Sequence, residues 1–204
     1  MIIRRVFVKI LFIVSILGFF SNVVANEQDD LKAHFLEKLS DIIKIIENKQ
    51  FIKDERNEKI VNELTPMFDF KLMAKLSLGK KEWMSLSKDE REKFVTLYVE
   101  RMKNSYSSKI DSYENEEITI TNVKRKKSRI LLATEIATAE KNLKVVYKFY
   151  KPKKRKKDKD TWLIYDVEII GISILKADKA QFKEFLRTQT IEDLMEALAK
   201  KKTS

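Results

Sequence analysis

Apolar side chains recur every three or four residues through the first half of the chain, which is the spacing of one helix face. The first of these stripes, interrupted by charged residues, consists of Leu31, Phe35, Leu39, Ile42 and Ile46. A second, shorter helix is expected over residues 54–64. The chain restarts at Pro66, and the next apolar segment ends at Gly79, a residue type that commonly terminates helices. The first half is therefore predicted to be helical.

A long helix is predicted to follow. Ser87 and Glu90 have the S-x-x-E spacing of a capping box, in which each side chain bonds the backbone of the other residue. A helix over residues 88–112 would be about 38 Å long at 1.5 Å per residue. Its apolar stripe is Phe94, Tyr98, Met102, Tyr106, Ile110 and Tyr113.

The apolar period changes from helical to two after this helix, which is typical of strands with one buried face. Four antiparallel strands are expected, over residues 117–123, 129–138, 143–150 and 161–170. In the third strand, the side chains on one face are expected to be Leu143, Val145, Tyr147 and Phe149. In the fourth strand, the corresponding set is Leu163, Tyr165, Val167 and Ile169.

The last part of the chain returns to a helical pattern. Residues 151–160 are almost wholly charged and predict a solvated hairpin loop. A helix is expected to open at Asp178 with Gln181, and a further helical turn at Thr190. The order of elements predicts an α+β fold, with helices packed on one face of a curved four-stranded antiparallel sheet.

The N-terminus has the three parts of a secretory signal. Arg4, Arg5 and Lys9 form a basic region, and residues 10–20 are apolar apart from one serine and one glycine. A membrane anchor would need about 20 apolar residues, more than this segment offers. Cleavage is expected after Ala25, where small side chains precede a polar stretch. The basic region also resembles a twin-arginine export motif, although the strongly apolar segment favours general secretion.

Removal of residues 1–25 would leave 26–204, the size of one ordinary domain. The chain has no cysteine, so no disulfide braces the fold. The formal charge is +11, or +8 without the signal, which favours an acidic partner. Since export removes the protein from most nucleic acid, an anionic membrane surface or an acidic protein fits better.

The residues available for catalysis are few. His34 is the one histidine, expected at the surface, and with no cysteine present the ligand sets of zinc, haem and Cys-His sites are lacking. Beyond the signal the glycines are Gly79 and Gly171, so there is no phosphate-binding loop, and Ser173 lacks the glycine spacing of a nucleophile elbow. No catalytic residue, metal site or cofactor is predicted.

Three further features have two interpretations each. Asp166 and Glu168 share a strand face, and a solvated outer face is favoured over an acid-base pair. The basic runs 124–127 and 151–159 fall at strand turns, as solvated turns or as a docking surface for acidic groups. Tyrosines along the long helix and the last two strands suit either a core or the mouth of an apolar cavity. They are Tyr98, Tyr106, Tyr113, Tyr147 and Tyr165.

Two long motifs resemble the MlaC family, also called toluene-tolerance auxiliary proteins. The first motif consists of Phe68-Asp69-Phe70, Met73-Ala74, Leu78-Gly79, Trp83, residues 87–92, Phe94 and Asn104-Ser105-Tyr106. The second runs from Trp162 to Val167 and on to Gly171-Ile172-Ser173, and the apolar residues of the C-terminal helices follow in order. The chain departs from the family pattern at Ile170, where an acidic residue is common, at Thr190, where a glycine is common, and in its very basic loop.

The resemblance implies a nuclear-transport-factor-like cone with an apolar cavity. It further implies a periplasmic carrier that holds the acyl tails of a glycerophospholipid and maintains outer-membrane lipid asymmetry. Its partners would be an outer-membrane lipoprotein complex and an inner-membrane ABC transporter with a membrane-anchored substrate-binding subunit, and not nucleic acid. By carry-over, Tyr106 and Ile172 would contact the tails, between the long helix and the sheet. Further lining candidates are Phe94, Tyr98, Met102, Val145, Tyr147 and Val167.

Two alternatives remain open at the level of the sequence. One is an enzyme of the same cone-shaped fold, in which Asp69 or Asp166 would point into the cavity. The other is an envelope adaptor with a filled core and no ligand.

Overall fold

A computed structural model describes residues 26–110, 116–138 and 141–200, with the backbone alone for 106–110. The signal predicted over residues 1–25 lies outside these ranges. The helices are α1 (Glu27–Glu47), α2 (Lys53–Leu64), the 3-10 turn η1 (Thr65–Met67), α3 (Phe70–Leu78), α4 (Lys80–Ser85), α5 (Lys88–Ile110), α6 (Ile174–Phe185) and α7 (Ile191–Lys200). The strands are β1 (Ile118–Lys126), β2 (Arg129–Ala137), β3 (Asn142–Tyr150), β4 (Leu163–Ile169) and β5 (Ile172–Ser173).

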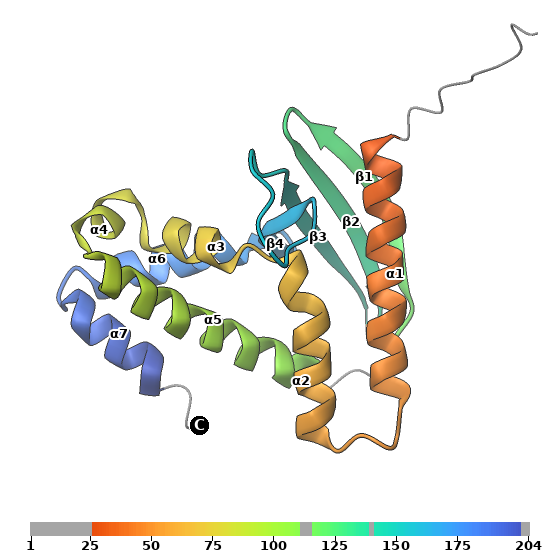
Figure 1. The fold of residues 1–204 in the computed structure, drawn as a ribbon, viewed down its shortest axis with the longest axis horizontal. Helices are drawn as coiled ribbons and strands as arrows, with labels where there is room; N and C mark the ends of the chain where they lie inside the picture. Colours follow the sequence, from red (N-terminus) through yellow and green to blue (C-terminus); the bar gives the residue numbers. More distant parts are fainter. Residues whose placement is uncertain (1–25, 111–115, 139–140, 201–204) are drawn as a thin grey trace, which may run out of the picture.

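The strands form one antiparallel sheet in the order β1-β2-β3-β4-β5. Helix α1 runs along one face of this sheet, and α3 to α7 form a helical group beside it (Figure 1). The predicted α+β class is therefore confirmed. The sequence pattern does not predict three short elements, the turn η1, the helix α4 and the two-residue strand β5, because none is long enough to establish a period.

The helix ends follow from local hydrogen bonds. Asp69 caps α3 by accepting a bond from the Leu72 amide at 3.1 Å, and α3 ends at Gly79, whose φ of 89° is unfavourable for other residues. The capping box predicted before α5 is confirmed. The Ser87 amide donates to Glu90 at 2.7 Å, and the Glu90 amide donates to the Ser87 hydroxyl at 3.3 Å.

A β-bulge corrects the predicted face of the fourth strand. Lys148 pairs with Asp166, but Phe149 pairs with Ile164, so Tyr165 is the extra residue. The side chains that share the inner face with Phe149 are consequently Ile164, Val167 and Ile169. Leu163 and Tyr165, expected on this face, are not part of that set, because one inserted residue reverses the alternation before it.

The predicted start of α6 at Asp178 is also wrong. The helix begins at Ile174, because Ser173 caps it by accepting a bond from the Lys176 amide at 3.1 Å. Asp166 holds this cap in place, accepting bonds from the Ser173 hydroxyl at 2.8 Å and the Leu175 amide at 3.1 Å. Asp166 is only 3% exposed, so the expectation that it lies on a solvated outer face is corrected.

Candidate functional site

An apolar cavity of about 390 Å³ lies between the first two helices and the inner face of the sheet. Most of its lining residues belong to α1, α2, η1 and strands β2 to β4, and most are aliphatic or aromatic. They are Phe35, Lys38, Leu39, Ile42, Leu64, Met67, Phe68, Glu116, Ile136, Thr138, Leu143, Val145, Tyr147, Ile164, Val167 and Ile169. A concave apolar space with few polar groups is the usual form of a small-molecule site.

The wall opposite the sheet is helix α1. The helix contacts the sheet through the rings of Phe35 and Tyr147, whose centroids lie 4.9 Å apart with planes tilted by 56°. Polar contacts fasten the N-terminal end of the helix. Glu27 forms ion pairs with Arg125 at 2.6 Å and with Lys151 at 2.8 Å. The helix is thus fixed at its start and stands over the cavity further along.

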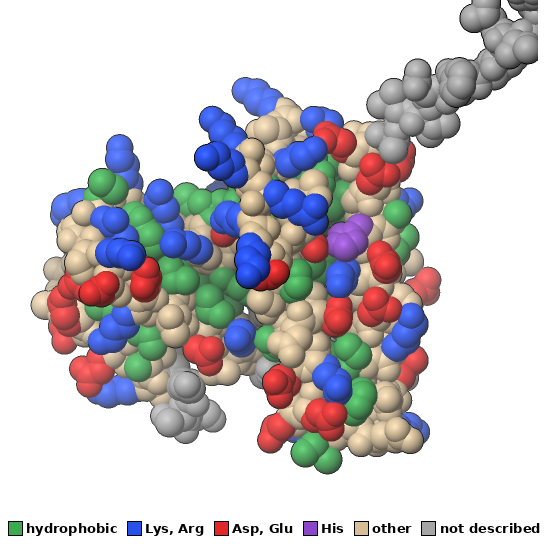
Figure 2. Space-filling view, in the orientation of Figure 1, with side chains coloured by type: hydrophobic (Ala, Val, Ile, Leu, Met, Phe, Trp, Pro, Cys, Tyr) green, Lys and Arg blue, Asp and Glu red, His purple; other side chains and the backbone are tan. Residues whose placement is uncertain are grey.

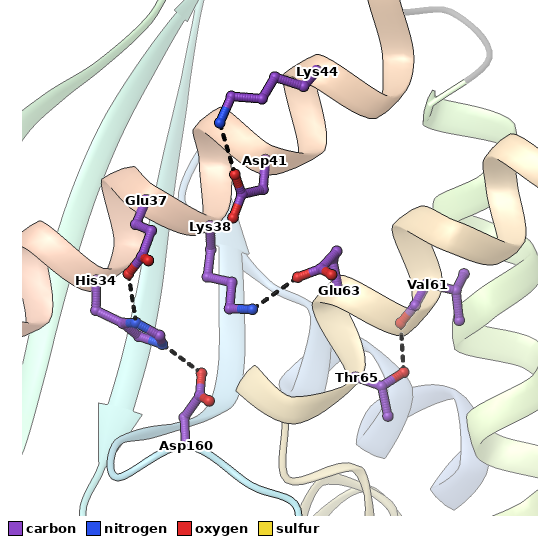
Figure 3. A network of polar contacts seen from close by, with 9 residues as sticks. All are labelled: His34, Glu37, Lys38, Asp41, Lys44, Val61, Glu63, Thr65 and Asp160. Atoms are coloured by element: carbon purple, nitrogen blue, oxygen red, sulfur yellow. Dashed lines mark hydrogen bonds and ion pairs between the residues drawn. The ribbon is translucent and has the colours of Figure 1, made fainter. Parts of the chain in front are cut away.

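A polar network connects α1 with α2 and the β3–β4 loop (Figure 3). Lys38 of α1 forms an ion pair with Glu63 of α2 at 2.8 Å, and His34 lies 2.8 Å from Asp160 in the loop. The hydrogen bond with Glu63 raises the pKa of Lys38, so its ammonium group stays charged. His34, expected at the surface, is half-buried and takes part in this network. The network places charge at one end of an otherwise apolar space.

Tyr147 brings a hydroxyl group into the cavity wall but no charge. Burial raises the pKa of Tyr147 to about 12, an effect that a hydrogen bond with Thr134 partly opposes. The phenol therefore remains neutral at physiological pH, and this wall of the cavity stays compatible with hydrocarbon.

Three of the residues predicted from the sequence line the cavity together: Val145, Tyr147 and Val167. They lie on adjacent strands, and Tyr147 pairs directly with Val167 across the β3–β4 ladder. Cross-strand partners present their side chains to the same face of a sheet, which explains why these residues converge.

Three other predicted residues lie in the helical core and not along this cavity. Phe94, Tyr98 and Met102 are at most 3% exposed. Phe94 packs edge-on against Phe182 of α6, with centroids 6.0 Å apart, and the Tyr98 hydroxyl donates to Asp178 at 2.9 Å. The stripe on α5 thus faces α6, and the cavity lies on the other side of the fold, under α1.

The two residues carried over from the family motifs lie elsewhere. Ile172 is 67% exposed in β5 and pairs with Ile169, which lines the cavity, so Ile172 stands at the sheet edge beside it. Tyr106 belongs to α5, and its side chain lies outside the described residues.

The cavity also includes residues that were not predicted as site residues. The most important are Phe35, Leu39 and Ile42 of α1. Their spacing identified a helix face, but a stripe of this kind looks the same whether it packs against a core or borders a cavity. The α5 stripe, which is rich in aromatic residues, does not line this cavity.

Neither Asp69 nor Asp166 lines this cavity, whose one acidic lining residue is Glu116. Asp69 lines a different cleft, and Asp166 is engaged by Ser173, Leu175 and Lys148. Among the residues the structure describes, no group of three or more His, Cys, Asp or Glu could hold a metal ion. Within the same ranges, no helix is long and apolar enough to cross a membrane.

The fold and cavity define an α+β protein in which a helix covers an apolar space on a meander sheet. The sequence model of the MlaC protein matches residues 37–200, and the chain belongs to the MlaC family. A solved structure with the same fold is the phospholipid-binding protein from Ralstonia solanacearum in complex with a phospholipid. It is 14% identical with a TM-score of 0.70, over 83% of this chain and 95% of the other. A search of curated proteins finds no significant match.

Proposed function

We propose that this chain is a phospholipid carrier that holds acyl tails in the cavity between α1 and the sheet. The observation that carries the proposal is the cavity of about 390 Å³, whose walls are mostly aliphatic and aromatic. Membership of the MlaC family supports it, as does the shared fold with a protein that was solved with bound phospholipid.

The energetics of hydrocarbon burial suit such a carrier. Burying an acyl tail of ~16 carbons stabilises the complex by roughly 12 kcal/mol, at ~0.8 kcal/mol per methylene. Release into water would cost the same amount, so the lipid has to pass directly between apolar environments. Transfer of a tail from a membrane to the cavity changes the free energy little, because both environments are apolar. The direction of transfer is therefore set by partner proteins.

We propose the periplasm as the place of action, since the MlaC family is periplasmic. The partners proposed are an outer-membrane lipoprotein complex and an inner-membrane ABC transporter with a membrane-anchored substrate-binding subunit. The lining proposed for the tails consists of Val145, Tyr147 and Val167, facing Phe35 and Leu39. Ile172 is proposed as a contact at the edge of the cavity.

The two alternatives have less support. An enzyme would need Asp69 or Asp166 in the apolar cavity, and neither carboxylate lines it. A ligand-free adaptor would need a filled space under α1, whereas the helix stands off the sheet over a cavity large enough for a small molecule.

The experiment is solvent extraction of the purified mature protein, followed by mass spectrometry. Phospholipid in stoichiometric amount is the expected result. A small polar ligand would instead support an enzyme, and an empty protein would support the adaptor.

A further inference from the structure

A second hollow of about 610 Å³ lies between α3, the start of α5 and the β3–β4 loop. Its floor includes the apolar side chains of Leu72, Trp83 and Val95. In Figure 2, Lys and Arg side chains gather over the loop and over the α3–α4 region, with apolar atoms in the hollow between them. We refer to this hollow as the basic cleft.

The basic cleft has a cationic rim. Five cations line it, Lys71, Lys75, Lys88, Arg91 and Lys156, against the two carboxylates of Asp69 and Glu92. Lys156 and Asp69 neutralise each other, since they form an ion pair at 2.5 Å. The remainder of the rim is therefore clearly positive.

In the part of the chain that the structure describes, the other four cations are not paired with a carboxylate. Among the described residues, Lys71, Lys75 and Lys88 form no ion pair, and all three are exposed. Arg91 is held in place by donating to the carbonyls of Trp83 at 2.9 Å and Met84 at 3.3 Å, and it stacks on the Trp83 ring. These carbonyls position the guanidinium without cancelling its charge.

We propose that the basic cleft binds an acidic segment of a partner protein, with carboxylates over the lysines of the rim and an apolar side chain against Trp83. The shape favours a protein segment over an anionic membrane, because a concave cleft admits a chain and not a flat surface. An aromatic anchor point within a ring of charges is also the usual arrangement at protein interfaces.

The basic cleft is separate from the lipid cavity, and no residue lines both. Two consecutive residues line different spaces: Phe68 lines the cavity, and Asp69 lines the cleft. A partner bound in the cleft would therefore leave the cavity free to exchange lipid. Failure of the cleft proposal would also leave the carrier proposal intact.

The test uses a short fluorescein-labelled peptide in which glutamate and leucine alternate, with binding followed by fluorescence anisotropy. The combined change Lys71→Glu, Lys75→Glu and Lys88→Glu is expected to weaken binding by about tenfold or more at low salt. The control is Lys32→Glu, Lys49→Glu and Lys126→Glu, three exposed lysines away from the cleft, and it is expected to change binding by less than about twofold. Both variants carry the same net charge, so general attraction is matched.

Four further measurements complete the test. Circular dichroism verifies that both variants are folded, and substitution by glutamine in place of glutamate should give a smaller loss in the same direction. Replacing the leucines of the peptide by serine should weaken binding to the unmodified protein. Equal losses in the cleft and control variants, or no binding of the peptide, would overturn the proposal. Binding of the same variants to phosphatidylglycerol vesicles is measured in parallel. A cleft variant that loses vesicle binding but keeps peptide binding would make the cleft a membrane contact and would also overturn the proposal.

Discussion

The ring of Phe35 on α1 packs against the ring of Tyr147 on β3, with centroids 4.9 Å apart. Both side chains line the apolar cavity, so this contact joins its two walls. Phe35 and Tyr147 are apolar residues that border a cavity, whereas Phe94 is an apolar residue that fills the core.

Phe35→Ala and Phe94→Ala should therefore differ in their effect on stability. Phe94 is fully buried in close-packed surroundings, and its truncation should lower the free energy of unfolding by about 4 kcal/mol. Phe35→Ala should cost about 2 kcal/mol, because Phe35 borders a cavity and its ring therefore has fewer packing contacts to lose. Urea denaturation of the lipid-free proteins measures both values. An equal or larger loss for Phe35→Ala would mean that α1 covers a filled core.

How far the sequence predicts this architecture depends on the range of the interactions involved. The capping box at Ser87 and the alternation in β3 depend on local sequence, and the structure confirms both. The start of α6 depends on Asp166, which reaches the Ser173 cap from β4, and the reversed face of β4 depends on a bulge. Neither is visible in a periodic pattern.

The structure brings only some of the predicted lining residues together at the cavity, for a related reason. Val145, Tyr147 and Val167, which are predicted as further lining candidates, share the inner face of two adjacent strands and line the cavity. The stripes on α1 and α5 have the same helical spacing, and only tertiary packing shows that α5 faces Phe182 and α1 faces the cavity. Aromatic content does not distinguish the two stripes, because large rings also fill cores efficiently.

Ile170 is strained, and relieving the strain should stabilise the protein. Its φ of 49° lies in the left-handed region, which is unfavourable for a β-branched side chain, and the side chain is 57% exposed. Ile170→Gly should raise the free energy of unfolding by about 1 kcal/mol, since the relieved strain exceeds the added entropy of the unfolded chain. Thermal unfolding measures this, with Ile172→Gly as the control. Stabilisation by the control and not by Ile170→Gly would contradict the account.

Because of Asp69, the free energy of unfolding should depend on pH in the acidic range. Burial opposes its ionisation, but hydrogen bonds from Lys156, Tyr150 and the Leu72 amide outweigh burial and lower its pKa below the usual 3.8. Because the pKa of Asp69 is lower in the folded protein than in the unfolded chain, its ionisation stabilises the fold at pH values above the unfolded-state pKa. This contribution is lost as the pH falls through the folded-state pKa. Stability should therefore decline below about pH 4.

Asp69→Asn isolates this contribution, since asparagine can still cap α3. The variant should be less stable by about 1–3 kcal/mol at neutral pH, and its stability should fall less steeply on acidification. Denaturant titrations across the acidic range provide the comparison. Parallel pH profiles for the two proteins would show that Asp69 does not carry the effect.

The exposed cations of the β3–β4 loop should affect the rate at which the protein meets an acceptor membrane, and not the amount of lipid that it holds. Lys153, Lys154 and Arg155 are exposed, whereas Lys156 is bound to Asp69. Changing the first three to glutamine should slow lipid transfer to acceptor vesicles containing anionic lipid, and the difference should vanish at high salt. Bound lipid per protein should not change. A parallel fall in bound lipid would place these residues at the cavity mouth.

The most direct test of the central claim is the phospholipid content of two cavity variants, Leu39→Glu and Ile169→Glu, one in each wall. A carboxylate there would lie unpaired against hydrocarbon, which costs several kcal/mol and should expel the tails, whereas an empty cavity can admit water and leave the protein folded. Leu36→Glu, on the same helix but outside the cavity lining, is the matched control. Mass spectrometry of the extracts should find stoichiometric phospholipid in the unmodified protein and in Leu36→Glu, and almost none in the two cavity variants. Folded cavity variants that retain full phospholipid occupancy would contradict the account.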